Sequence, residues 1–116
     1  MMMRAISERE RFLIEGVAKR LPPQDASQLI EDMNRCSAVD RFPDGAVVLF
    51  IIEGYDRPKY EGQHSYPVEI RLSDADGADL TAILFADPND RLYELEIVRW
   101  DLGVLVGPNM ESVEFY

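Results

Sequence analysis

The alternation of apolar and polar residues over positions 66–98 constrains the fold more than any other feature of this chain. Between positions 66 and 72 every second side chain is apolar, and these are Tyr66, Val68, Ile70 and Leu72. Successive side chains of a strand point to opposite faces of a sheet, so these four share one face. Glu69 and Arg71 lie between them and point to the other face. The pattern predicts a half-buried strand of an antiparallel sheet.

Two turn motifs predict how the following strands pair. Asp76 and Gly77 predict a two-residue hairpin turn, because both of its central positions need a positive φ, which glycine permits and aspartate tolerates. This turn would pair residues of the core face, Leu72 with Thr81, Ile70 with Ile83 and Val68 with Phe85. The sequence DPND at 87–90 predicts a three-residue loop at 88–90. That loop would pair Asp87 with Arg91, Phe85 with Tyr93, Ile83 with Leu95 and Thr81 with Ile97.

This pairing predicts that Glu94 and Glu96 face away from the core. A slip of one residue would place both carboxylates among apolar side chains, where an unpaired charge costs several kcal/mol. The outer face of the sheet would be mixed, carrying Glu69, Arg71, Leu80, Ala82, Leu84, Leu92, Glu94, Glu96 and Val98. Its apolar members need a cover, for which the candidates are the loop at 53–65, the segment 102–116 and another chain.

Two helices are expected before the strands. Ser7 and Glu10 have the spacing of a capping box, which predicts a helix that begins near Glu8 and stops at residues 22–23, the two prolines. Asp25 and Gln28 repeat this spacing, and an apolar stripe continues to about residue 35. The short connection between the two stripes favours an antiparallel helix pair.

Residues 46–52, AVVLFII, are continuously apolar and predict a central strand that is buried on both faces. Residues 53–65 contain two glycines and a proline without a sustained period, so we expect a long exposed loop there. Whether residues 102–116 add a further strand is left open. We expect a single domain over residues 1–116 of the α+β class, with two N-terminal helices packed on one face of a mainly antiparallel sheet of four or five strands.

Composition argues against several classes of function. The chain has 12 Lys and Arg against 22 Asp and Glu, and its net charge of −10 disfavours nucleic-acid binding and favours a basic partner. No run approaches the roughly 20 apolar residues that span a bilayer, and the first ten residues lack the apolar centre of a signal peptide. We therefore expect a cytoplasmic protein that is not in a membrane. Cys36 is the only cysteine, so an intramolecular disulfide is excluded.

The acidic motifs do not match a metal site or a catalytic pair. When Gly77 takes the sixth position of a calcium-binding loop, Leu72 and Ile83 stand where the first and last acids belong. Glu94 and Glu96, about 7 Å apart along one strand, lack an environment that would keep one of them protonated as a catalytic acid. His64 is the only histidine, which excludes a site with several histidines. We expect no metal and no cofactor, and an enzyme is less favoured than a binding protein.

We interpret the chain as a non-enzymatic protein that binds another protein through the long loop and the acidic outer face. Tyrosine and arginine are enriched at binding hot spots. The expected partner-binding residues are Tyr55, Arg57, Lys59, Tyr60 and His64 in the loop, with Glu69, Arg71, Glu94 and Glu96 on the outer face.

Two alternatives stay open. One is a small-molecule-binding or enzymatic domain with a pocket between residues 53–65 and the sheet. The other is a self-associating domain, a homodimer joined through Leu80, Leu84, Leu92 and Val98.

Four short motifs are spread along most of the chain. They are Arg4, Ile6, Ser7 and Glu10 near the start, Asp44 and Gly45 before a strand, the D-x-D-G turn at 74–77, and a strand at 92–99 that begins L-Y-E-L-E-I. With these motifs the chain resembles a family of small uncharacterised bacterial proteins. It has Val98 and Arg99 where that pattern has a Trp-Lys pair, with Trp100 one place later. The motifs are architectural, so the resemblance implies a fold and no activity.

Overall fold

The computed structural model describes residues 2–116 and contains two helices and one antiparallel sheet. The helices are α1 (Glu8–Ala18) and α2 (Pro23–Arg35). The strands are β1 (Cys36–Asp40), β2 (Val47–Ile52), β3 (His64–Ser65), β4 (Ile70–Ser73), β5 (Asp79–Ala86), β6 (Leu92–Arg99) and β7 (Asn109–Phe115). The predicted α+β class is confirmed, but the sheet has seven strands rather than the predicted four or five.

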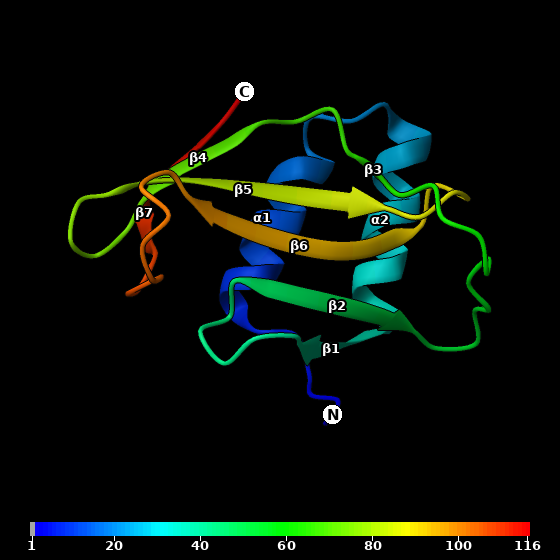
Figure 1. Ribbon diagram of the computed structural model, residues 1–116. Helices are drawn as coiled ribbons and strands as arrows, with labels where there is room; N and C mark the ends of the chain where they lie inside the picture. The colour runs from blue at the N-terminus through cyan, green and yellow to red at the C-terminus, as the bar shows by residue number, and fades with distance from the viewer. Residues whose placement is uncertain (1) are drawn as a thin grey trace.

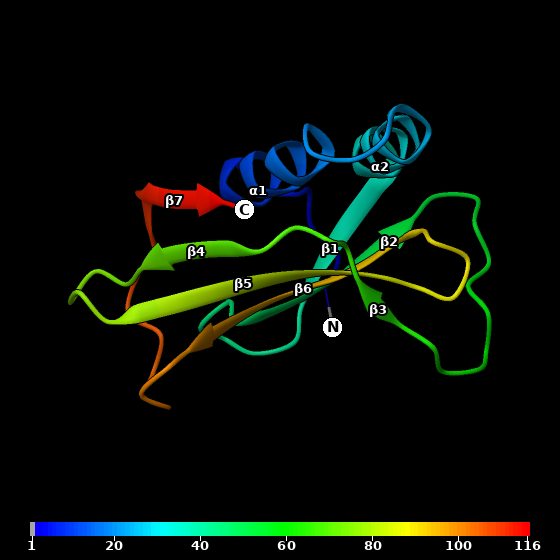
Figure 2. The same cartoon turned by 90° about the horizontal axis from the view of Figure 1, so that it is seen from above.

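The sheet has the order β1-β2-β6-β5-β4-β7, and β3 pairs with β5 beyond the end of β4 (Figure 1). Both helices lie on one face of this sheet, and no helix lies on the opposite face (Figure 2). The hydrophobic core fills the space between the helices and the sheet, and its fully buried members include Leu13, Leu29, Phe50, Ile70 and Leu84. We call the helix-free side of the sheet the outer face.

Helix α1 begins as the sequence predicts. The hydroxyl of Ser7 accepts a hydrogen bond from the backbone N–H of Glu10, and the Glu10 carboxylate accepts one from the N–H of Ser7. Gly16 lets strand β7 approach this helix, because a Cβ atom at Gly16 would collide with the ring of Phe115. The edge strand β7 is thereby packed against α1 rather than left bare.

Helix α2 begins three residues earlier than the capping pattern of Asp25 and Gln28 predicts, and that prediction is wrong. Pro22 is the N-cap residue, and no side chain caps this end. The fixed φ of Pro23 suits the first turn of a helix, where a missing N–H group leaves no hydrogen bond unmade. Ala26 then donates the first backbone hydrogen bond, to the carbonyl oxygen of Pro22.

The turn between β4 and β5 has three residues, not the predicted two. The N–H of Asp74 donates to the carbonyl oxygen of Ala78, and the N–H of Gly77 donates to that of Asp74. Gly77 has a φ of 91°, whereas Asp76 has no positive φ, so the expected type I′ turn does not form. Pairing moves by one residue, and Ile70 faces Ala82 instead of Ile83.

The loop between β5 and β6 has the predicted length, but a bulge follows it. Asp87 donates its N–H to the carbonyl oxygen of Arg91 and Ala86 faces Leu92, as expected. The register then shifts, so that Phe85 faces Glu94 and Ile83 faces Glu96. An extra residue in one strand changes which side chains share a face. Consequently β5 is inverted relative to the prediction. Strand β6 keeps its predicted orientation from Glu94 onward, whereas Leu92, before the bulge, lies in the core rather than on the predicted outer face.

The inversion of β5 exchanges the side chains that face the helices with those that lie on the outer face. Leu80, Ala82 and Leu84 are buried against the helices, whereas Thr81, Ile83 and Phe85 lie half-buried on the outer face. Leu92 is also fully buried, so the proposed self-association surface of Leu80, Leu84, Leu92 and Val98 does not exist as a surface.

Strand β2 lies between β1 and β6, inside the sheet as predicted. It is not buried on both faces, because Ile51 is 46% exposed on the outer side. Among residues 2–116, no helix is long and apolar enough to cross a membrane.

The inverted register makes a testable prediction about two neighbouring residues of β5. Leu84 is 2% exposed and Ile83 is half-buried, so Leu84→Ala should lower the free energy of unfolding by about 3 kcal/mol and Ile83→Ala by about 1 kcal/mol. Urea unfolding of both variants measures the difference. A larger loss for Ile83→Ala would instead support the two-residue turn.

Candidate binding site

Five carboxylates are buried in this acidic chain, and most of them hold a loop, a helix or a terminal segment in place. They are Glu10, Asp32, Asp74, Asp87 and Glu94. A buried carboxylate is stable only when hydrogen bonds and an opposite charge replace the lost water. The first four meet this condition through arginines and backbone N–H groups, and Glu94 does not. Within residues 2–116, no three His, Cys, Asp or Glu side chains form a group that could hold a metal ion.

Asp87 anchors the loop at 53–65 to the turn between β5 and β6. Its carboxylate accepts hydrogen bonds from the hydroxyl of Tyr55 at 2.7 Å and from Arg57 at 3.0 Å. It also accepts from the backbone N–H groups of Asn89 and Arg91. Burial alone would raise the pKa of Asp87, but these hydrogen bonds and the charge of Arg57 outweigh it and hold the pKa below its ordinary value. The loop is therefore fixed at its start.

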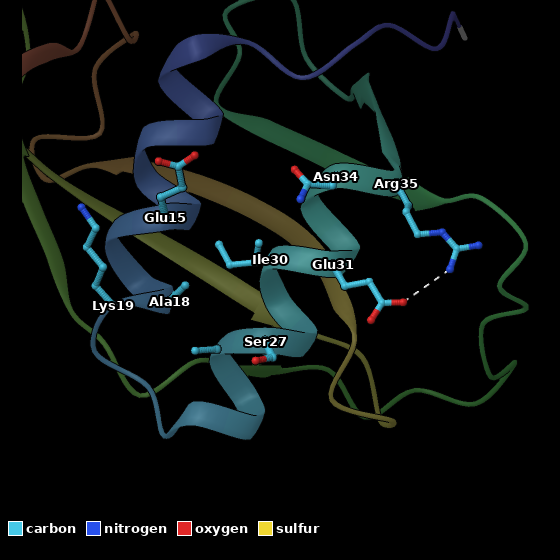
Figure 3. Close-up of a pocket in the computed structure, with 9 residues that line it drawn as sticks. Glu15, Ala18, Lys19, Ser27, Ile30, Glu31, Asn34 and Arg35 are labelled. Atoms are coloured by element: carbon cyan, nitrogen blue, oxygen red, sulfur yellow. Dashed lines mark hydrogen bonds and ion pairs between the residues drawn. The ribbon is translucent and has the colours of Figure 1, made fainter.

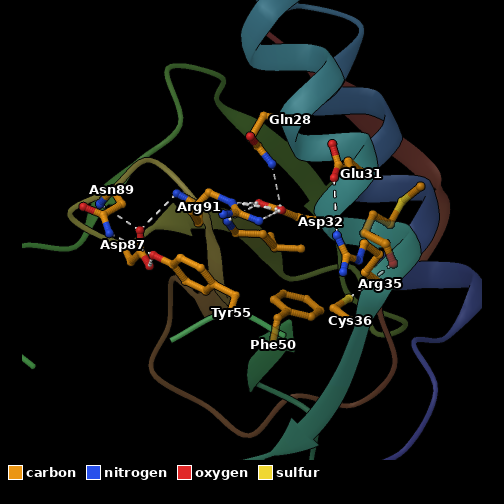
Figure 4. A network of polar contacts seen from close by, with 12 residues as sticks. Gln28, Glu31, Asp32, Arg35, Cys36, Phe50, Tyr55, Asp87, Asn89 and Arg91 are labelled. Carbon is orange, nitrogen blue, oxygen red and sulfur yellow. Dashed lines mark hydrogen bonds and ion pairs between the residues drawn. The ribbon is translucent and has the colours of Figure 1, made fainter. Parts of the chain in front are cut away.

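Asp32 joins helix α2 to the sheet (Figure 4). Its carboxylate accepts hydrogen bonds from the guanidinium of Arg91, the shortest at 2.6 Å, and from the backbone N–H of Leu92. Gln28, one turn earlier on α2, donates a further bond to it. The guanidinium of Arg91 lies 4.3 Å from the ring centre of Tyr55, so this ion pair continues into the anchor of the loop.

Asp74 anchors the segment 100–108. It accepts hydrogen bonds from the N–H groups of Val106 at 2.9 Å and Gly107 at 2.7 Å, and from Arg99 at 2.8 Å. Burial alone would raise the pKa of Asp74, but these contacts hold it well below its ordinary value. Asp76 also binds Arg99, so the acids of the D-x-D-G turn hold an arginine rather than a cation from solution.

Glu94 differs from the other buried carboxylates. It is 4% exposed, and its ion pair within residues 2–116 is a distant one, 3.9 Å from Arg41. Burial and the neighbouring charge of Glu96 raise the pKa of Glu94, and Arg41 only partly opposes them. The two glutamates lie on the outer face, because Leu95 and Ile97 belong to the core on the other side of β6. Their predicted orientation is therefore correct.

The outer face is largely apolar for a face that no helix covers. Around Glu94 and Glu96 it carries a patch of aliphatic and aromatic side chains, which are Leu49, Ile51, Ile83, Phe85 and Val98. We call these residues with the two glutamates the outer patch. Near the edge of this patch a depression of about 360 Å³ lies between Met3, Leu49, Ile51 and Tyr93. Antiparallel sheets that face water usually carry polar side chains there.

A cavity of about 460 Å³ lies between the loop at 53–65 and the sheet. The residues that line it include three cations, which are Arg41, Arg57 and Lys59. Arg57 is held in place by Asp87 and by the carbonyl oxygen of Phe50 at 2.6 Å. Its guanidinium also lies 4.8 Å from the ring centre of Tyr93. This is the location where the small-molecule alternative expects a pocket.

Two other hollows lie elsewhere on the molecule. One, of about 500 Å³, contains His64, whose Nε2 lies 2.7 Å from Asp90, and it extends to Gln28 on α2. The other is an open groove of about 790 Å³ between α1 and α2, with Ala18, Ala26 and Ile30 as its floor. Charged side chains such as Lys19 and Glu31 stand at its sides (Figure 3).

The five predicted partner-binding residues of the loop at 53–65 fall into three regions. Lys59 and Tyr60 line the loop cavity, while Tyr55 and Arg57 belong mainly to the network that anchors the loop. His64 lies in β3 beside the second hollow.

The remaining predicted residues lie on or beside the sheet. Glu94 and Glu96 belong to the outer patch. Glu69, just before β4, pairs at 2.7 Å with Arg71 on β4, two strands away from β6, and the rings of Trp100 and Tyr116 flank Arg71. The structure does not bring the nine residues together in one site.

Sequence reasoning missed Asp32, Asp87, Arg91 and Arg41, which organise the loop and its cavity. An aspartate before proline gave a local signal at Asp87, because it often accepts bonds from the backbone of its own turn. Asp32 and Arg91 lie 59 residues apart in the sequence, and no local pattern predicts such a pair.

The anchor at Asp87 predicts a loss of stability on neutralisation. Asp87→Asn should lower the free energy of unfolding at pH 7 by about 2 kcal/mol, because Arg57 loses its buried partner. Asp56→Asn, on the exposed part of the same loop, should change it little. Because the folded-state pKa is lowered, the stability given by Asp87 should decline as pH falls below its ordinary value of 3.8. Urea unfolding between pH 7 and pH 3 tests both statements.

For Glu94 we expect neutralisation to change the free energy of unfolding in the opposite direction. Glu94→Gln should raise the free energy of unfolding at pH 7 by roughly 1 kcal/mol, because it removes a buried and weakly paired charge. Because the pKa of Glu94 is raised in the folded state, its protonated form stabilises the fold at pH values below the ordinary pKa of 4.5. This stabilisation is lost as the pH rises through the folded-state pKa. The gain should therefore vanish near pH 4, and Glu111→Gln, on exposed β7, should show neither effect. A destabilised Glu94→Gln at pH 7 would mean that Arg41 is a strong partner.

One of three comparisons with known proteins found a match. Neither the curated proteins nor the solved structures contain a match to it. A family model described as a domain of unknown function (DUF6984) matches residues 3–108, which is more than half of the chain. The match agrees with the expected kinship to an uncharacterised domain family. The chain therefore belongs to the family of domains of unknown function DUF6984.

Proposed function

We propose that this chain is a binding protein that attaches to a basic protein through the outer patch and the adjoining loop at 53–65. The observation that carries the proposal is the apolar character of a sheet face that no helix covers (Figure 2). Contiguous exposed apolar patches on soluble proteins commonly mark sites of protein binding. An enzymatic role has less support, because four of the five buried acids are engaged in close arginine pairs.

The shape of the outer patch suits an anchored interface. Binding energy at protein interfaces concentrates in a few side chains that fill pockets. The depression between Met3, Leu49, Ile51 and Tyr93 offers such a pocket at about 360 Å³. It adjoins Arg57 at the fixed start of the loop, so a partner that fills it would also touch the loop.

Charge favours a basic partner over a second copy of the chain. A twofold symmetric dimer through the outer patch would bring Glu94 and Glu96 near their own copies, and two chains of net charge −10 repel each other. A basic partner would instead give Glu94 the close cation that it lacks, since Arg41 remains 3.9 Å away. Electrostatic complementarity of this kind also raises the rate of association.

Photo-crosslinking in the native host tests this proposal. A benzoylphenylalanine replaces Ile83 on the outer patch or, as a matched control, Ile30, which is equally half-buried on the helix side. We expect position 83 to crosslink to a protein with an exposed basic surface and position 30 not to do so. In a Glu96→Lys background the yield at position 83 should fall by at least about tenfold, whereas Glu31→Lys on α2 should leave it unchanged.

Three outcomes would contradict the proposal. They are crosslinks at position 83 only to a second copy of the chain, equal crosslinking from both positions, and no crosslink from position 83 at all. Circular dichroism of each purified variant separates a lost contact from a lost fold.

A further inference from the structure

We propose that the cavity between residues 57–63 and the sheet is a binding site for a small organic anion, a phosphate or a carboxylate that carries a flat apolar group. The cavity has a volume of about 460 Å³, within the usual range of small-molecule sites. This inference goes beyond the proposed protein binding. The cavity shares Arg57 and Tyr93 with the depression beside the outer patch, but its test rests on Arg41 and Lys59, so each proposal can fail without the other.

The first support is the concentration of positive charge. Arg41, Arg57 and Lys59 are three of only 12 basic residues in a chain with 22 acidic ones. Arg41 is 54% exposed, and Lys59 takes part in none of the ion pairs within residues 2–116. These two side chains can therefore turn toward a ligand without breaking a strong contact.

The acids of the cavity cancel only part of this charge. Asp87 forms a buried ion pair with Arg57, so these two charges offset each other and leave Arg41 and Lys59 as the cations of the cavity that Asp87 does not neutralise. Glu61 is exposed at the rim and makes no ion pair within residues 2–116. The lining of the cavity therefore carries three cations against two acids, in a chain whose net charge is −10.

The second support is that one cation is fixed in advance. Two bonds, to Asp87 and to the carbonyl oxygen of Phe50, immobilise Arg57, and the ring of Tyr93 lies beneath its guanidinium. A fixed group costs little entropy on binding. With 23% of its side chain exposed, Arg57 still presents charge to the cavity.

The walls indicate what the rest of the ligand is like. Pro58 and Pro88 contribute rigid apolar surface, and Tyr60 contributes a ring that is 67% exposed. A flat apolar group could lie against these surfaces while its anionic end meets the cations. A bare inorganic anion would use only half of this lining, so it should bind more weakly than an aromatic phosphate.

Titrations with phenyl phosphate, inorganic phosphate and a hexaglutamate peptide, followed in ¹H–¹⁵N spectra, test the inference. Phenyl phosphate should bind with a dissociation constant of about 1 mM or tighter, shift the amide signals of residues 57 and 59–63, and lose affinity as ionic strength rises. Inorganic phosphate should shift the same amides at higher concentration.

The chain offers matched control variants. Lys59→Gln should weaken phenyl phosphate binding by roughly tenfold, whereas Lys19→Gln, at the other lysine of the chain, should leave it unchanged. Arg41→Gln should likewise weaken it, and Arg35→Gln, with nearly the same exposure of 52%, should not. Equal losses in test and control variants, binding of hexaglutamate alone, or no shift with either phosphate would overturn the inference.

Discussion

The number of residues in the turn between β4 and β5 determines which side of the central strand meets the helices. With three residues at positions 75–77, Leu80 and Leu84 enter the core and Ile83 and Phe85 face outward. One residue fewer would exchange these sets. The bulge after the next loop restores the original orientation in β6, which keeps Leu95 inside and Glu94 outside. The composition of the outer patch depends on these two local features, since the turn places Ile83 and Phe85 on this face and the bulge places the glutamates beside them.

Ion pairs between arginines and buried acids hold the segments that surround the sheet in place. Arg4 with Glu10 holds the N-terminal segment, Arg91 with Asp32 holds α2, and Arg99 with Asp74 holds the C-terminal segment. Such pairs add little net stability compared with apolar replacements, but breaking one leaves a costly unpaired charge. These ion pairs therefore fix the positions of α2 and of the two terminal segments relative to the sheet. Glu94 lacks a close arginine, and it lies where we propose that a basic partner binds.

Local patterns in the sequence account for the helices and for much of the sheet. The capping box at Ser7 and the alternation at Ile70 and Leu72 depend on neighbours in the chain, and both were predictable. The turn at Gly77 was not, because glycine with a positive φ suits two-residue and three-residue hairpins alike. Strand β7 needs the space left by Gly16, and the loop cavity needs Asp87 to hold Arg57. Contacts over such separations carry no periodic signal, so the candidate site could be predicted only as a region.

Thiol labelling of β5 tests whether Leu84 faces the helices and Ile83 faces outward. The outer patch depends on this orientation of the strand. Cysteine is introduced as Ile83→Cys or as Leu84→Cys in a Cys36→Ala background, which removes the native thiol. We expect rapid modification of the thiol at position 83 by a water-soluble maleimide, and protection at position 84 until the protein unfolds. Rapid labelling at position 84 with protection at position 83 would contradict this expectation, and the outer patch would then have to be abandoned.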